Sequence, residues 1–492
     1  GGPTNSIKYA GEGWPSLFND GGTVRAAQSF LTNQQEQSLL SFLGRAAYSY
    51  KKRYMAELSI RADGSSVFGK DVRWGTFPSV GLGWAFSEEH FMKKFWWLSF
   101  GKLRASWGKS GQKFQEPYLA LGVMEESNIF NGSLGLIPQS MANKKLTWEE
   151  SDQYDLGLDL QMLDYRLKLK LDYYYKYSSK LLMQSYLPGN VFLATSMWDN
   201  ASAISNEGIE FEAQYDVIRK KNWNWSVGFN LSHNKNMLRK TYNGEDLNDK
   251  VLGRPVYGIY TFKDEGIVQK EEDIPMYLNA SGKQIPLYFQ SINNPLRVGG
   301  RKIKDQNYDG VIDDKDLYYA GSTLPAVYGG LNSHLEWKGL SFDVLFSYTI
   351  SRKVMNMYKN SAFTFTKDFG VIMNYFHAGD FWTTSNRDAK YPSLEFADKD
   401  YVGQFDGNVD SNIENISFLR LKQLVIGYQI PKNWLKGSFI KDANVYLSGE
   451  NLFLLTNYSG VDPEIINPYS GKDDGTQYPL NRKVTLGLNL KF

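Results

Sequence analysis

A twelve-residue stretch at 305–316 has the sharpest chemical signature in the sequence. Oxygen-bearing side chains stand at positions 1, 3, 5, 9 and 12, with glycine at position 6 and an apolar residue at position 8. Ca²⁺ takes about 6–8 oxygen ligands, and one can be the backbone carbonyl of position 7. We therefore predict a Ca²⁺ site with the ligands Asp305, Asn307, Asp309, the Val311 carbonyl, Asp313 and Asp316.

Two departures qualify this predicted metal site. Position 12 is Asp316, whose carboxylate is shorter than that of the usual Glu, so bidentate binding is harder to achieve. No helix pair is evident around the stretch, which favours a structural brace for the long connection 234–324 over a switch. The alternative is an acidic, solvated turn rich in Asp and Gly that binds no metal.

Other reactive residue types are scarce. The chain has no Cys, which excludes disulfides, zinc–cysteine sites, iron–sulfur clusters and thiol nucleophiles. Its four His are scattered, and His334 stands on the polar side of a predicted strand between Asn332 and Glu336. No strained Gly-x-Ser-x-Gly elbow accompanies it. We expect His334 to be hydrogen-bonded to its neighbours, and the chain not to be an enzyme.

Composition excludes further classes of protein. Of the 492 residues, 15% are aromatic and 22% are charged, so the chain is too apolar for a disordered protein. The 55 Lys and Arg against 53 Asp and Glu leave a net charge of +2, so bulk attraction to nucleic acid is not expected. No uninterrupted apolar stretch approaches the roughly 18–20 residues of a spanning helix.

Alternation of apolar and polar residues dominates the chain. Because successive Cβ atoms of a strand point to opposite faces, each alternating run predicts a strand with one apolar and one polar face. A short helix is also expected over 87–97, with Ser87 as its cap. We expect about thirteen strands, near 38–50, 54–62, 76–86, 98–108, 146–162, 166–177, 204–218, 222–233, 325–337, 339–350, 416–430, 442–453 and 481–492.

The lengths of the strands and of their connections favour a transmembrane antiparallel β-barrel over a soluble sandwich. Many strands run beyond the roughly five or six residues of ordinary strands, and membrane strands need about 9–11. Short and long connections also alternate, as in outer-membrane barrels. The polar faces would line a lumen or pair with a plug. They carry Lys102, Arg104, Asp155, Asp159, Arg166, Lys168, Lys170, Glu210, Glu212, Asp216, Asp343, Arg420 and Lys422.

The loop pattern also predicts an orientation and an incomplete barrel. Short turns lie in the periplasm, so the first strand descends from outside and the last ends at Phe492 in the periplasm. Thirteen strands are an odd number, whereas single-chain bacterial barrels have an even one, and bare sheet edges are not tolerated in lipid. We expect 1–37 to be an extracellular loop segment and 38–492 the C-terminal portion of a barrel. Its edge strands would pair with strands outside this chain.

Several segments in order along nearly the whole chain resemble the SusC/RagA family of TonB-dependent outer-membrane transporters of Bacteroidetes. The resemblance rests on the set, since no one segment is specific alone. The segments are "RADGSSVFG" at 61–69, "RWGTFPSVGLGWAFSEEHFM" at 73–92, "KLRASWGKSG" at 102–111, "LTWEESDQYDLGLD" at 146–159, "NEGIEFE" at 206–212, "DQNYDGVIDDKD" at 305–316, "GENLFLLTNYSGVDPE" at 449–464 and the ending "YPLNRKVTLGLNLKF".

The resemblance implies a barrel of about 22 strands around an N-terminal plug, of which this chain holds the C-terminal strands and no plug. It implies TonB-dependent import of a large polar nutrient, an oligosaccharide or a peptide, with a SusD-like surface lipoprotein as a lid. The alternatives are a transporter-like barrel serving as a structural subunit of an outer-membrane assembly and, less favoured, a barrel enzyme.

Aromatic residues suggest two further roles. The last strand closes on Phe492, and a terminal aromatic after an alternating strand resembles the signal read by the outer-membrane assembly machinery. Aromatic loop residues could stack on sugars, grip peptides or dock a lid protein. These are Trp14, Phe18, Trp198, Phe376, Phe381 and Trp382.

Overall fold

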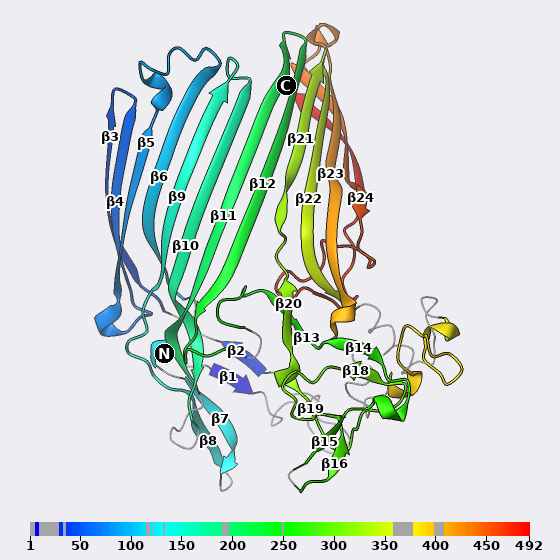
Figure 1. Cartoon of the computed structure of the whole chain (residues 1–492). Coiled ribbons are helices and arrows are strands. Elements are labelled where there is room, and N and C mark those ends of the chain that lie inside the picture. The colour runs from blue at the N-terminus through cyan, green and yellow to red at the C-terminus, as the bar shows by residue number, and fades with distance from the viewer. Residues whose placement is uncertain are drawn as a thin grey trace, which may run out of the picture.

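The computed structural model contains one large antiparallel sheet that forms a curved wall (Figure 1). Consecutive long strands are neighbours throughout, so the wall is a meander from β3 to β26. The structure describes residues 5–8, 29–32, 36–114, 119–121, 123–130, 133–188, 196–247, 250–279, 281–357, 377–397 and 408–492.

The thirteen predicted wall strands are confirmed, and a short fourteenth, β25 (Lys472–Asp473), pairs in parallel with β22. Many wall strands are longer than predicted, because they continue past the membrane-facing stretch on the side of the long loops. The wall strands are β3 (Leu39–Tyr50), β4 (Tyr54–Ser65), β5 (Trp74–Trp84), β6 (Leu98–Gln112), β9 (Glu149–Met162), β10 (Leu167–Tyr186), β11 (Ser196–Lys220), β12 (Trp223–Lys240), β21 (Val327–Trp337), β22 (Leu340–Asn356), β23 (Ile413–Gln429), β24 (Asp442–Thr456) and β26 (Lys483–Lys491).

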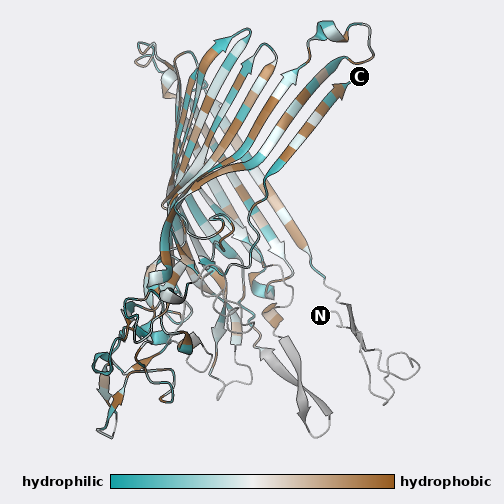
Figure 2. Ribbon diagram, turned by 90° about the vertical axis from the view of Figure 1, so that its right-hand side faces the viewer, coloured by the Kyte–Doolittle hydropathy of each residue, from teal (hydrophilic) through white to brown (hydrophobic). Residues whose placement is uncertain are grey.

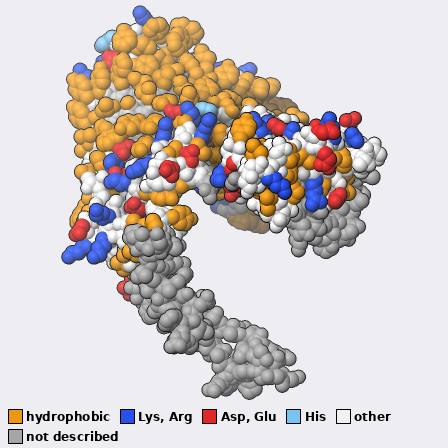
Figure 3. Space-filling view, turned by 60° about the horizontal axis from the view of Figure 1, so that its bottom comes forward, with side chains coloured by type: hydrophobic (Ala, Val, Ile, Leu, Met, Phe, Trp, Pro, Cys, Tyr) orange, Lys and Arg blue, Asp and Glu red, His pale blue; other side chains and the backbone are white. Residues whose placement is uncertain are grey.

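The strand register gathers the alternating residues into rows that cross the wall. Leu158, Leu171 and Phe211 are paired across β9, β10 and β11 in one apolar row. One position away, Lys170 lies between Asp159 and Glu212 in a polar row on the opposite face. The same banding alternates along the strands in Figure 2, and the wall face seen in Figure 3 is almost entirely apolar. One face of the wall therefore suits lipid and the other suits a polar lumen.

Short connections join the strands at one end of the wall, as predicted. The two-residue turn of Lys338 and Gly339 has φ values of +47° and +89°, which match the twist of a hairpin. The predicted helix over 87–97 is wrong, because only a 3₁₀ turn, η3 (Phe86–Glu88), forms there. Glu89, within this segment, accepts a hydrogen bond of 2.6 Å from the Tyr54 hydroxyl.

Among the described residues, no helix is long and apolar enough to cross a membrane. Within that same part of the chain, β3 pairs only with β4 and β26 only with β24, so the wall is open at both edges (Figure 2). Of the predicted segment 1–37, the structure describes the paired strands β1 (Asn5–Lys8) and β2 (Ser29–Thr32) and residues 36–37.

The long connections at the other end hold small sheets that the sequence did not predict. Connection 113–148 contains the hairpin of β7 (Val123–Phe130) and β8 (Ser133–Ser140). Connection 241–326 packs with residues 408–412 around an apolar cluster of its own, and we call this unit the outer platform (Figure 1). Its strand pairs are β13 (Gly258–Thr261) with β20 (Tyr318–Ser322), β14 (Asp264–Ile267) with β18 (Arg301–Ile303), β15 (Met276–Leu278) with β16 (Gln284–Pro286) and β17 (Tyr288–Phe289) with β19 (Val311–Ile312).

Candidate functional site

The stretch predicted to bind Ca²⁺ is a tight turn in the outer platform. The Asp305 carboxylate accepts hydrogen bonds from the backbone amides of Tyr308, at 2.7 Å, and Gly310, at 2.8 Å. Gly310 has a φ of +83°, and a Cβ there would lie 3.0 Å from the ring of Tyr277. Burial, reinforced by a hydrogen bond to Asp305, raises the pKa of Tyr277 to about 12. The glycine predicted for the sharp turn is therefore required by both backbone and packing.

The second half of the stretch is a capped 3₁₀ turn, η6 (Asp314–Asp316). Asp313 accepts from the Lys315 amide at 2.8 Å, and Asp316 accepts from the amides of Gln306 and Asp313 at 2.8 and 2.9 Å. Asp316 is fully buried and Asp305 is nearly so. Burial raises the pKa of Asp316, and the negative charge of Asp305 adds to this effect. Two carboxylates are thus held close together inside one turn.

The donor set of a Ca²⁺ site is present, but it does not converge on one point. Asn307 accepts from the Asp309 amide at 3.0 Å and donates to the Asp309 carboxylate at 2.9 Å. The Lys315 ammonium lies 3.6 Å from Asp313 and 4.0 Å from Asp309, with 71% of its side chain exposed. No three acidic or His side chains are gathered for a metal in the described part of the chain. An ion would have to displace Lys315 and turn the Asn307 and Asp309 side chains.

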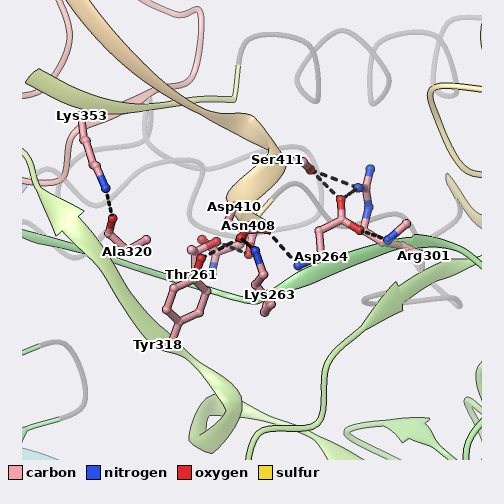
Figure 4. A network of polar contacts seen from close by, with 11 residues as sticks. Thr261, Lys263, Asp264, Arg301, Tyr318, Ala320, Lys353, Asn408, Asp410 and Ser411 are labelled. Carbon is pink, nitrogen blue, oxygen red and sulfur yellow. Dashed lines mark hydrogen bonds and ion pairs between the residues drawn. The ribbon is translucent and has the colours of Figure 1, made fainter. Parts of the chain in front are cut away.

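A polar network around Asp410 and Asp264 joins two long connections (Figure 4). The Asp410 carboxylate accepts from Lys263 at 2.6 Å, from Tyr318 at 2.7 Å and from the Asp264 amide at 2.9 Å. Burial raises the pKa of Asp410, but hydrogen bonds from Lys263, the Asp264 amide and Tyr318 outweigh it, and the pKa lies below its ordinary value. Asp410 is therefore held as a carboxylate that clamps 408–412 to the rest of the platform.

The clamp has a second carboxylate and a tether to the wall. Asp264 forms an ion pair with Arg301 and accepts from the Ser411 hydroxyl at 2.6 Å. Lys353 on β22 donates to the Ala320 carbonyl of β20 at 2.6 Å. The outer platform is thus fixed to one strand of the wall (Figure 4). The sequence does not predict this network, because its partners are more than 30 residues apart and each is an ordinary polar or charged residue by itself.

A third long connection, 457–482, is anchored on the polar face of the wall. Arg420 lies 2.5 Å from Asp462, both side chains are 3% exposed, and Arg420 also pairs with Glu464. Lys422 lies 2.7 Å from Glu464. Arg352 on β22 donates to the Ile466 and Asn467 carbonyls of this connection, each at 3.4 Å. Arg420 and Lys422 lie on the polar face predicted to line a lumen or pair with a plug, and there they bind a loop of their own chain.

A pocket of about 650 Å³ opens between the outer ends of β10, β11 and β12 and the segment that follows β12. Ile204 in its wall shares the face of β11 that carries Glu210 and Glu212, so the pocket lies on the polar face. It is lined by aliphatic and aromatic side chains, among them Leu181, Leu238 and Trp198, and by polar and charged ones, among them Asn243, Asp246 and Lys250.

Trp198 lines this pocket, whereas Phe381 and Trp382, also predicted to contact a ligand or a lid protein, do not. Phe381 and Trp382 are buried, and Trp382 donates to Gln269 at 3.0 Å, so they are packed inside the protein and are not free to stack on a ligand. Trp14, Phe18 and Phe376 lie outside the described residues.

Phe492, predicted as an assembly signal, is exposed, and His334, predicted to bind its neighbours, is hydrogen-bonded. Phe492 is 63% exposed and stacks on Phe439, with ring centroids 5.5 Å apart and planes 9° from parallel. His334 hydrogen-bonds Asp343 at 2.5 Å, as expected for a His satisfied by its neighbours.

Comparison with known proteins gives concordant results. Residues 3–268 match the family described as "TonB dependent receptor-like, beta-barrel". The chain is 32% identical to TonB-dependent receptor P26 of Formosa agariphila, over 96% of this chain and 48% of that protein. It is 29% identical to TonB-dependent receptor SusC of Bacteroides thetaiotaomicron, over 98% of this chain and 46% of that protein. The chain therefore spans about half the length of the curated relatives it matches.

Solved structures agree at the level of the fold. A chain of the RagAB peptide transporter superposes with a TM-score of 0.74 at 24% identity, covering 97% of this chain and 50% of that one. These relatives are receptors and transporters, not enzymes. As its motifs predicted, the chain belongs to the TonB-dependent receptor-like β-barrel family of integral outer-membrane proteins and is of the SusC/RagA type.

Proposed function

We propose that the protein imports a large polar nutrient, an oligosaccharide or a peptide, across the outer membrane with energy delivered by TonB. The observation that carries this proposal is a wall with one apolar and one polar face, whose mouth bears a platform held by two ion pairs, Lys263 with Asp410 and the buried Arg301 with Asp264. A fixed platform suits the docking of a SusD-like lipoprotein, which would act as a lid over the mouth. The plug and the remaining barrel strands would lie outside this chain.

The proposed orientation places the outer platform outside the cell. The long connections and the beginning of β3 lie at one end of the wall, and the short turns and Phe492 lie at the other (Figure 1). Bacterial barrels keep short turns in the periplasm and longer loops outside. The C-terminus of the chain would then be periplasmic, and the start of the chain would be extracellular.

Growth on candidate nutrients tests the import proposal. A strain lacking the protein should fail to take up one class of oligosaccharide or peptide, and the intact protein should restore uptake only when TonB is present. Trp198→Ala should reduce uptake by altering the pocket on the polar face, whereas Trp434→Ala, at the opposite end, should not. Uptake unchanged by loss of either the protein or TonB would favour a structural subunit of an outer-membrane assembly.

We also propose that 305–316 binds Ca²⁺ as a brace for the outer platform. The support is the turn itself, in which the oxygens of Asp305, Asp313 and Asp316 already cap backbone amides around Gly310. Binding by Asp305, Asn307, Asp309, the Val311 carbonyl, Asp313 and Asp316 would neutralise the buried carboxylates. Extracellular Ca²⁺ modules bind with dissociation constants of about 10⁻⁴–10⁻³ M, and we expect this range.

Terbium luminescence tests the metal proposal, because nearby Tyr rings sensitise a Tb³⁺ ion that replaces Ca²⁺. Asp305→Asn should abolish the signal and raise hydrogen exchange in 305–316 to the level seen after chelation. Asp388→Asn, an exposed site in another connection, is the control and should change neither measurement. Equal luminescence from both variants would contradict a site at this turn.

Phe492 is proposed as part of the signal for barrel assembly. Deleting it should lower surface abundance more than it lowers the stability of barrels already inserted. Phe439→Ala removes the stacking partner and leaves the terminal residue, so it separates recognition of Phe492 from packing. Equal abundance of wild type and the deletion variant would refute the proposal.

A further inference from the structure

Charge is distributed unequally between the two ends of the wall. We call the six short connections the short-turn rim; they are 51–53, 85–97, 163–166, 221–222, 338–339 and 430–441. The short-turn rim holds 11 Lys and Arg against 3 Asp and Glu, a net charge of +8. The six long connections hold 22 Lys and Arg against 29 Asp and Glu, a net charge of −7. They are 66–73, 113–148, 187–195, 241–326, 357–412 and 457–482. The overall charge of +2 conceals this asymmetry.

Few acidic groups at the short-turn rim neutralise its basic side chains. Of the three acidic residues, Glu89 already accepts from Tyr54 and Trp84 and pairs with Arg53 at 3.3 Å. Exposed lysines occur in several separate turns, so the positive charge encircles much of this end of the wall. These lysines are Lys51, Lys52, Lys93, Lys94, Lys432 and Lys436.

Several of these cations lie beside aromatic rings at the end of the apolar wall. The ammonium of Lys51 is 5.1 Å from the ring centre of Tyr50, and that of Lys338 is 5.4 Å from the ring centre of Trp337. Lys94 has the same relation to Phe95 at 5.3 Å. Basic heads next to rings at the edge of an apolar belt are typical of the zone where lipid headgroups meet the hydrocarbon.

Large aromatic side chains of the short-turn rim are also strongly exposed. Trp96 is 84% exposed, Trp434 73% and Phe439 77%. Aromatic rings prefer the boundary between headgroups and acyl chains, so such exposure is expected where lipid covers them. An aqueous surface would leave all three rings in water.

We propose that the short-turn rim binds the anionic headgroups of phospholipids in the adjacent leaflet. The lysines would contact lipid phosphates, while the rings of Trp96, Trp434 and Phe439 lie at the headgroup boundary. Basic groups near an anionic leaflet are attracted within about one Debye length, and the acidic connections at the other end would be repelled. The proposal rests on the proposed function only in naming this leaflet as the periplasmic one.

Quenching by brominated lipids in nanodiscs tests the proposal on the full-length protein. The intrinsic Trp fluorescence should be quenched more by brominated phosphatidylglycerol than by brominated phosphatidylcholine, and salt should reduce the difference. A rim variant with Lys93→Gln, Lys94→Gln, Lys432→Gln and Lys436→Gln should lose at least about tenfold in relative affinity for the anionic lipid. The matched control, on exposed lysines of the long connections, is Lys70→Gln, Lys144→Gln, Lys270→Gln and Lys283→Gln.

The outcomes separate binding at the short-turn rim from a general effect of charge. A preference for the anionic lipid that falls in the rim variant and persists in the control supports the proposal. An equal fall in both variants would show that total charge alone sets the preference and would overturn the proposal. No preference in the wild type would also overturn it. Nanodiscs require no transport, so a failure of the import proposal would leave this result unaffected.

Discussion

Antiparallel strands are joined in different ways at the two ends of the wall. At the short-turn rim, connections as short as two residues use backbone conformation, as in the turn of Lys338 and Gly339. At the other end, long connections fold over the mouth and are held by buried ion pairs, such as Arg420 with Asp462. Local turn chemistry therefore fixes one end, and contacts between distant segments fix the other. Substitutions at each end can break or sharpen this contrast, and their expected effects range from several kcal/mol to a few tenths.

Arg420→Met should have the largest effect. It leaves Asp462 buried without its cation, which costs about 3–5 kcal/mol for a buried pair. We expect connection 457–482 to lose protection in hydrogen exchange while the strands of the wall keep theirs. Lys483→Met is the control, because it breaks an exposed pair with Glu450 at 3.7 Å and should cost about 0–1 kcal/mol. Equal loss of protection in the two variants would show that burial does not decide the strength of these pairs.

Asp410→Asn should release the clamp of the outer platform at a cost of about 1–3 kcal/mol. The Asp410 carboxylate accepts hydrogen bonds from Lys263, Tyr318 and the backbone N–H of Asp264, and the side-chain amide of Asn cannot replace all three. Hydrogen exchange should rise in 258–267 and 408–412. Asp388→Asn, exposed and outside the network, should leave both segments unchanged.

The same carboxylate predicts the pH dependence of the clamp. The pKa of Asp410 is lower in the folded protein than its ordinary value, so its contribution to stability is complete above that ordinary value. The contribution should be lost as the pH falls through the lower, folded value. Exchange in 408–412 should therefore rise on acidification in the wild type and show no such step in Asp410→Asn. A step retained in the variant would assign the titration to another group.

Gly310→Ala should cost about 1–3 kcal/mol through two separable terms, a left-handed φ and a contact with the ring of Tyr277. Gly282→Ala provides the matched control, since Gly282 has a φ of +72° and no atom within 4 Å of the added Cβ. The difference in local stability between the two variants measures the steric term alone. If Gly310→Ala costs no more than Gly282→Ala, the ring of Tyr277 moves aside easily and the turn is not rigid.

The contrast between the ends also explains what the sequence could predict. All thirteen wall strands follow from a period of two that is visible within each strand, and the short turns follow from the gaps between them. The clamp could not be predicted, since Lys263 and Asp410 are 147 residues apart and nothing local distinguishes them from solvated charges. The burial of Phe381 and Trp382 was missed for the same reason, because it depends on packing between connections. The predicted helix over 87–97 is replaced by successive turns with i→i+3 hydrogen bonds, and Glu89 binds Tyr54 and Trp84 on neighbouring strands.

Lys338→Asn should have the smallest effect on stability, and its sign should be favourable. Residue 338 has a φ of +47° and precedes a glycine at +89°, and Asn-Gly is the preferred pair for such a two-residue hairpin turn. We expect a gain of about 0.3–0.5 kcal/mol, measured as a small rise in the unfolding temperature of the barrel. The same change removes the ammonium that lies 5.4 Å from the ring of Trp337, so the preference for anionic lipid should fall slightly. Lys338→Gln removes the charge without improving the turn, and should lower lipid preference equally while leaving the unfolding temperature unchanged or lower. If both variants change the unfolding temperature equally, the charge of residue 338, and not turn chemistry, governs stability at this end. The two ends of the wall would then differ less in what holds them together.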